Sequence, residues 1–124
     1  SSADKGFAPA FAELGELFLK GLGGEKSKSQ AKKLFEMGVE RGDPSACMAL
    51  ADLCEKNEPE KAAKLYKNAA SYRYPPAMYK LAEYYERGIG LKKNIPKAIL
   101  LYEQLLPENP RLQESIDRLK NLGG

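Results

Sequence analysis

The stretch Ala77–Gly90, AMYKLAEYYERGIG, decides the fold, because two earlier stretches of the chain repeat its pattern. The earlier copies are Ala10–Gly23, AFAELGELFLKGLG, and Ala46–Asn57, ACMALADLCEKN. Each copy begins with Ala and carries Leu four positions later, then a small residue, then an aromatic residue or Cys three positions further on. The shared positions are Ala10, Ala46 and Ala77; Leu14, Leu50 and Leu81; Gly15, Ala51 and Ala82; and Phe18, Cys54 and Tyr85. Repetition at a period of this length indicates a stacked repeat architecture.

A second repeated stretch follows each copy of the first. It spans Gln30–Asp43, Lys61–Arg73 and Lys97–Asn109. The step from a second stretch to the next first stretch is 15 residues in both cases, from residue 31 to 46 and from 62 to 77. The step from first to second stretch is 21, 16 and 21 residues (10 to 31, 46 to 62 and 77 to 98). All variation in length therefore falls in one connection, which is how a loop varies between fixed elements.

Both stretches have the periodicity of amphipathic helices. In the third copy of the first stretch, the apolar stripe consists of Ala77, Met78, Leu81, Tyr84 and Tyr85. Gly88 and Gly90 are predicted to end this helix, because glycine adopts positive φ without strain. Ser27 and Asn94 are predicted to cap the starts of second helices. The unit is a helical hairpin, repeated three times.

We therefore expect an all-α, right-handed α-solenoid of about three helix-turn-helix repeats, followed by a C-terminal capping helix. Residues 1–124 form a single domain in this interpretation. It divides into residues 1–6, which match the tail of a preceding repeat's second helix, repeats at 7–43, 44–75 and 76–109, and a capping helix at 110–124. The capping helix places Leu112, Ile116 and Leu119 on one face. The partial unit at the start favours a fragment of a longer array.

The repeated pattern resembles the Sel-one-like repeat family, a relative of the tetratricopeptide repeats. The third copy matches best, at Ala77, Leu81, Ala82, Tyr85, Gly88, Gly90, Lys97, Ala98 and Tyr102. The middle copy departs from the family, since Asn57-Glu58-Pro59 replaces the Gly-x-Gly loop. The resemblance implies a solenoid scaffold that binds other proteins or peptides on a concave face lined by first helices. It also implies adaptor roles, in membrane-associated complexes for some members and in bacterium–host contacts for others.

Composition argues against several classes of function. The chain has no His, which removes the commonest general base and metal ligand. Its formal net charge of +3 is small for a nucleic-acid-binding module, and no run of about 18 apolar residues would cross a membrane. Cys47 and Cys54 occupy core positions about 10 Å apart along one helix, too far for a disulfide, which favours a reducing compartment such as the cytoplasm. We expect no catalytic, cofactor or metal site; a hydrolase using carboxylates is a distant alternative.

The surface indicates a function in binding. Two positions of each first helix, the second and sixth after the repeat Ala, are predicted to face inward beside the apolar stripe. They are Ala12, Met48 and Tyr79, and then Glu16, Asp52 and Glu83, with Glu55 and Glu86 one turn further on. This acidic column predicts a protein or peptide partner with a basic segment. Two alternatives remain: these are ordinary solvated residues, or the chain is a structural spacer within a larger multi-repeat protein.

Overall fold

The computed structural model describes residues 10–21 and 25–123, and these form seven α-helices, one short 3₁₀ helix and no strand. In chain order the elements are α2 (Ala10–Gly21), α3 (Glu25–Glu40), α4 (Pro44–Cys54), α5 (Pro59–Ser71), α6 (Pro75–Arg87), α7 (Ile95–Leu105), η1 (Leu106–Glu108) and α8 (Leu112–Gly123). The expectation for residues 1–6 lies outside the described residues. So does Gly23 at the end of the first copy.

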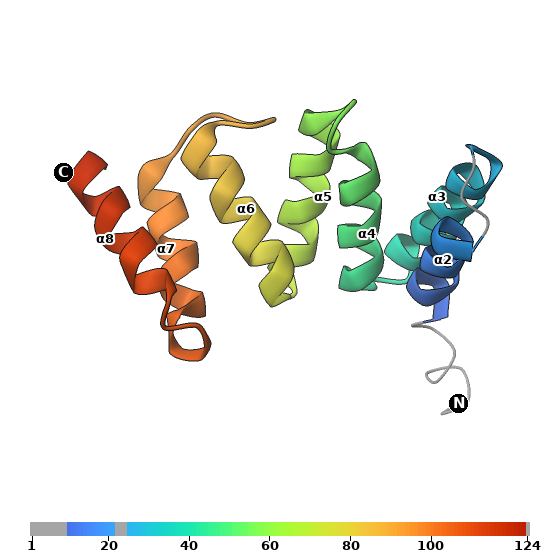
Figure 1. Ribbon diagram of the computed structural model, residues 1–124, viewed down its shortest axis with the longest axis horizontal. Coiled ribbons are helices and arrows are strands. Elements are labelled where there is room, and N and C mark those ends of the chain that lie inside the picture. Colours follow the sequence, from blue (N-terminus) through green and yellow to red (C-terminus); the bar gives the residue numbers. More distant parts are fainter. Residues whose placement is uncertain (1–9, 22–24, 124) are drawn as a thin grey trace.

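The helices pack in chain order, each against the next. Three hairpins form from α2 with α3, α4 with α5, and α6 with α7. Neighbouring hairpins then meet through α3 with α4 and α5 with α6, and α8 covers α7. Figure 1 shows the resulting row, with α2 and α3 at one end of the long axis and α8 at the other. The predicted all-α solenoid with a final capping helix is confirmed.

The ends of these helices follow from local sequence. Asn94 caps α7 as predicted, since its side chain accepts a hydrogen bond of 3.1 Å from the Lys97 N–H. Asp43 caps α4 in the same way, accepting from the Ser45 N–H at 3.0 Å. Gly88 ends α6 with φ of +70°, the left-handed conformation that glycine adopts without strain.

The prediction for Ser27 is wrong. The helix α3 begins at Glu25, so Ser27 lies within its first turns and is buried instead of capping the start. The equivalent starts of α5 and α7 are fixed by Pro59 and Pro96, which fit only in the first turn of a helix. No proline occurs between residues 25 and 43, so nothing stops α3 from beginning two residues earlier.

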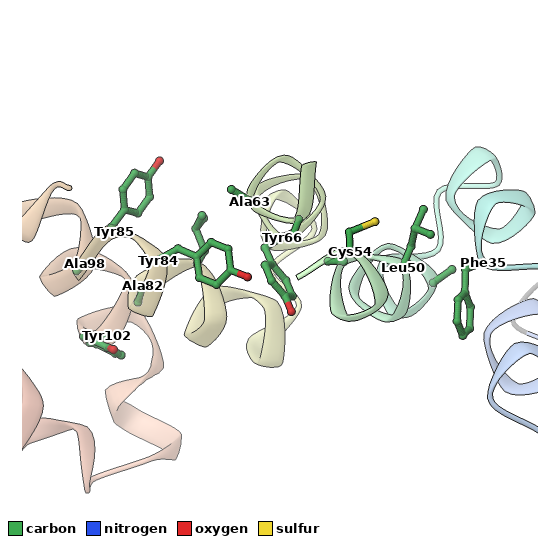
Figure 2. Close-up of a cluster of buried hydrophobic side chains, with 14 of the residues drawn as sticks. Phe35, Leu50, Cys54, Ala63, Tyr66, Ala82, Tyr84, Tyr85, Ala98 and Tyr102 are labelled. Atoms are coloured by element: carbon green, nitrogen blue, oxygen red, sulfur yellow. The ribbon is translucent and has the colours of Figure 1, made fainter. Parts of the chain in front are cut away.

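The core is built from the repeat positions: one main cluster runs through all three repeats and α8, and a small second cluster contains Cys47, Ala69 and Ala77. Leu50 and Leu81 are 3% and 5% exposed, and Cys47 and Cys54 are free thiols within the core, as predicted. Figure 2 shows how the main cluster continues from repeat to repeat. Aromatic side chains of the second helices fill it: Phe35, Tyr66 and Tyr102. Because each hairpin covers the next, loss of one core side chain affects two repeats.

One repeat position behaves differently at the start of the row. Leu14 aligns with Leu50 and Leu81 but is 43% exposed. The helices α4 and α6, which carry the latter two leucines, each pack against a preceding second helix, α3 or α5, whereas within the described residues no second helix precedes α2. The same sequence position is therefore core in two repeats and surface in the first.

Two tight turns require special backbone conformations. Gly90, with φ of +66°, brings the α6–α7 loop against the start of α5, where a Cβ atom would lie 2.2 Å from the Pro59 carbonyl oxygen. This contact ties the third hairpin to the second. After α5, Arg73 has φ of +60°, where Gly42 follows α3 with φ of +78°. A non-glycine residue is strained in this conformation.

Candidate functional site

One of the eight residues predicted to bind a partner lies in the core. Ala12 is 6% exposed and belongs to the main core. Its expected position on the face is therefore wrong. The helix α2 lies against both α3 and α4, and in this position it turns Ala12 inward and Leu14 outward. Alignment with Met48 and Tyr79 could not show this, because α4 and α6 each have a preceding second helix to pack against.

Three of the predicted acidic residues form hydrogen bonds within a hairpin or to the element that follows it. The hydroxyl of Tyr66 on α5 donates a short hydrogen bond to Asp52 on α4, within one hairpin. Glu55, directly after α4, accepts from the Tyr84 hydroxyl at 3.2 Å and from the Lys80 ammonium at 3.3 Å. Both of these donors lie on α6, so Glu55 joins the second hairpin to the third.

Glu86 repeats this arrangement one hairpin further on. It accepts from the Tyr102 hydroxyl of α7 at 3.0 Å and pairs with the Arg118 guanidinium of α8 at 2.5 Å. Its side chain is 13% exposed. The capping helix thus offers a cation to the preceding first helix, as Lys80 does for Glu55. Glu55 and Glu86 are committed to contacts within the protein and are not free for a partner.

The tyrosines of this network are held in their neutral form. Burial raises the pKa of Tyr66, Tyr84 and Tyr102, and the neighbouring carboxylates raise each pKa further, because a phenolate there would be desolvated and repelled. Tyr66 and Tyr84 also pack edge to face, with ring centroids 5.1 Å apart (Figure 2). As neutral donors, the hydroxyls satisfy carboxylates without cancelling their charge.

The sequence-based predictions do not include these tyrosine–carboxylate contacts, although the sequence contains a signal for some of them. The aligned aromatic position of the second helices is Phe35, Tyr66 and Tyr102, so two of its three members carry a hydroxyl. A hydroxyl at a buried position needs a partner. The nearest candidates were the acidic residues of the paired first helix.

Five of the eight predicted residues lie outside the core and form no ion pair within the described residues, and all five are on first helices. Asp52 and Glu16 are exposed, Met48 and Glu83 are half-buried, and Tyr79 is 37% exposed. The hydrogen-bond partner of Asp52 is a hydroxyl, which brings no positive charge to the carboxylate. Glu16 and Glu83 form none of the ion pairs found in the described part of the chain. These five residues, Glu16, Met48, Asp52, Tyr79 and Glu83, are called the first-helix face below.

Residues 10–21 and 25–123 give little support for metal binding, for a reactive thiol or for a membrane-spanning helix. No group of three or more Cys, Asp and Glu side chains there is arranged to hold a metal ion. Burial raises the pKa of the Cys47 and Cys54 thiols, which disfavours the reactive thiolate form. None of the described helices is long and apolar enough to span a membrane.

Comparison with known proteins agrees with the repeat pattern. The family model of the Sel1 repeat matches residues 8–43, 44–71 and 75–105. The chain is similar in structure to a Sel1 repeat protein from Oxalobacter formigenes, with a TM-score of 0.79 and 28% identity over 88% of this chain and 47% of that one. It also has the fold of c5321, a protective antigen of uropathogenic Escherichia coli strains with an SLR fold, with a TM-score of 0.81 and 24% identity.

The second of these similarities covers 97% of this chain but 27% of the antigen. The chain thus spans less than half the length of either structure. No curated protein matches the sequence. The family model covers three segments that together make up most of the chain, in the order and at the places where the hairpins lie. The chain belongs to the Sel1 repeat family.

Proposed function

We propose that this chain is a non-catalytic scaffold that binds a basic protein segment along the first-helix face. Sel1 repeat proteins generally act as scaffolds for protein interactions. The observation that carries the finer proposal is the difference between the two sets of acids on the first helices. Glu55 is paired with a cation of the following hairpin and Glu86 with one of the capping helix, whereas Asp52 and Glu83, one turn earlier, form no ion pair within the described residues.

On this face, acidic side chains without an ion-pair partner in the described chain lie beside apolar side chains. A partner segment that carries both basic and apolar residues would complement them. Met48 and Tyr79 lie at equivalent positions of α4 and α6, four residues before Asp52 and Glu83 respectively. Residues four apart are neighbours on one helix face. The second and third repeats therefore each pair one apolar side chain with one carboxylate, and a partner presenting apolar and basic residues would match both.

The magnitude of the charge effect is small for each pair. An ion pair at an exposed site contributes about 0–1 kcal/mol, so charge here sets association rate and selectivity more than affinity. Apolar contacts with Met48 and Tyr79 supply the rest. Binding is expected to weaken as salt is raised, because the Debye length falls from about 10 Å at 0.1 M to about 3 Å at 1 M.

The test begins with a random 12-residue peptide library displayed on phage and selected on the wild-type protein. Enriched peptides are synthesised with a fluorescent label, and their affinities are measured by anisotropy. The triple variant Glu16→Lys, Asp52→Lys, Glu83→Lys is expected to bind them at least tenfold more weakly. Because Asp52 also accepts from Tyr66, circular dichroism must show that the variant is folded, and Asp52→Asn provides a milder version.

A matched control variant distinguishes an effect of the first-helix face from an effect of the protein's net charge. The triple variant Glu36→Lys, Glu60→Lys, Glu114→Lys changes the net charge equally, at exposed positions on α3, α5 and α8. Its affinity should stay within about twofold of the wild type's after the general charge effect is screened at 0.3 M salt. Equal losses in the two triple variants would refute the proposal. A spacer without a binding face would enrich no peptide at all.

A further inference from the structure

The start of α6 is unusually apolar for the beginning of a helix. Its first two residues are Pro75 and Pro76, which have no N–H to offer, and Tyr74 before them provides no capping hydrogen bond. The equivalent start of α4 is polar, because Asp43 caps it and Ser45 donates to the same carboxylate. The third repeat thus presents hydrocarbon where the second presents hydrogen-bonding groups.

The end of α7 forms the opposite wall. Leu105 aligns with Ala69 of α5, which is fully buried against the following hairpin. After Leu105 the chain forms the short helix η1, and α8 follows. The end of α7 and the start of α6 lie at the same edge of the row (Figure 1). Between them is a groove of about 380 Å³ lined by Pro75, Pro76, Tyr79, Leu105, Glu108 and Asn109.

Tyr79, the aromatic residue that lines this groove, is held in place by a second aromatic ring. Tyr79 packs edge to face on Tyr102, with ring centroids 5.8 Å apart. Tyr102 is itself buried and fixed by its hydrogen bond to Glu86. A binding residue that is already ordered loses little freedom when a partner arrives, so it can act as an anchor point.

We propose that this groove takes one large apolar side chain, such as Leu or Phe, from a protein segment with Lys or Arg close to it. Its volume is at the small end for ligand sites, which suits one or two side chains of a peptide. The preference for a cation comes from charge: Glu108 lies on the rim, and Glu83 lies one turn beyond Tyr79 on α6. Neither carboxylate belongs to an ion pair of the described chain. The inference rests on the proposed function, since Tyr79 and Glu83 belong to the first-helix face.

The peptides enriched from the random library also test this inference. They should share a large apolar residue with Lys or Arg within two positions of it. Tyr79→Ala is expected to weaken their binding at least tenfold, and replacing the shared apolar residue of the peptide by Ser should have a similar effect. Glu108→Lys, at an exposed position, should weaken binding at least threefold without disturbing the fold.

Leu100→Ala is the matched control, because Leu100 is an exposed apolar residue of α7 that does not line the groove. It should leave the affinity unchanged. Peptides that respond to the reversal of Asp52 and Glu83 but not to Tyr79→Ala or Glu108→Lys would overturn the groove and leave the acidic face standing. Peptides that are indifferent to the acid reversal would overturn the proposed function. A selection that enriches nothing would overturn both.

Discussion

Truncating the same repeat position in two different repeats gives an internal test of the fold. Leu81→Ala removes a side chain that is 5% exposed, on a helix, α6, that packs against both α5 and α7. A buried Leu→Ala change loses about 2–5 kcal/mol of stability, because a cavity remains where the side chain was. Leu14→Ala changes the aligned residue at 43% exposure. Full burial of a Leu is worth about 1.5–3 kcal/mol, so this half-covered residue should lose about 1 kcal/mol.

The assay is urea unfolding followed by circular dichroism at 222 nm. With a slope of about 2 kcal/mol per molar urea, a loss of about 3 kcal/mol lowers the midpoint by about 1.5 M for Leu81→Ala. The midpoint for Leu14→Ala should fall by about 0.5 M on the same basis. Leu50→Ala, in the second repeat, should behave like Leu81→Ala. Equal shifts for the first and third repeats would refute the reasoning, since it requires the preceding second helix to create the buried site.

Three further perturbations follow from the contacts described above. Gly90→Ala is expected to destabilise the chain by at least 2 kcal/mol in urea unfolding, roughly the cost of a strained φ plus a clash with the Pro59 carbonyl; a neutral effect would show that the loop does not rest on α5. Arg73→Gly should raise stability by about 1 kcal/mol, because it relieves a positive φ, and a lower melting temperature would contradict this. Three buried tyrosines should ionise, in an alkaline titration followed at 295 nm, only as the protein unfolds; they are Tyr66, Tyr84 and Tyr102. Their raised pKa values mean that the folded state holds these protons more tightly, so the associated stability is complete below about pH 10 and is lost as the pH rises further; reversible ionisation of more than four of the seven tyrosines while the chain stays folded would count against the hydrogen bonds to carboxylates.

The repeat register made much of this fold predictable. It placed Leu50, Leu81 and both cysteines in the core, because equivalent positions of stacked hairpins meet equivalent surroundings. The same logic failed at Ala12 and Leu14. Their repeat lacks, within the described residues, the preceding helix that holds the others in place. Equivalence of sequence predicts equivalence of burial only where the neighbours are equivalent too.

The binding face was less predictable, since it depends on contacts between repeats. Glu55 and Glu83 look alike in the sequence, yet Glu55 is paired with Lys80 and Glu83 is not. Such a pair depends on which cations the following hairpin brings close, which no spacing along one helix reveals. The groove beside Tyr79 was missed for a related reason. It forms only where the end of the third hairpin returns to the start of α6.

The most direct test of the account is to map where an enriched basic peptide binds. Isotope-labelled protein is titrated with the peptide, and shifts of the backbone amide signals are followed by NMR. The largest shifts are expected on α4 and α6, around Met48, Asp52, Tyr79 and Glu83. Shifts concentrated instead on the second helices, around Lys64 of α5 and Leu100 of α7, would contradict it.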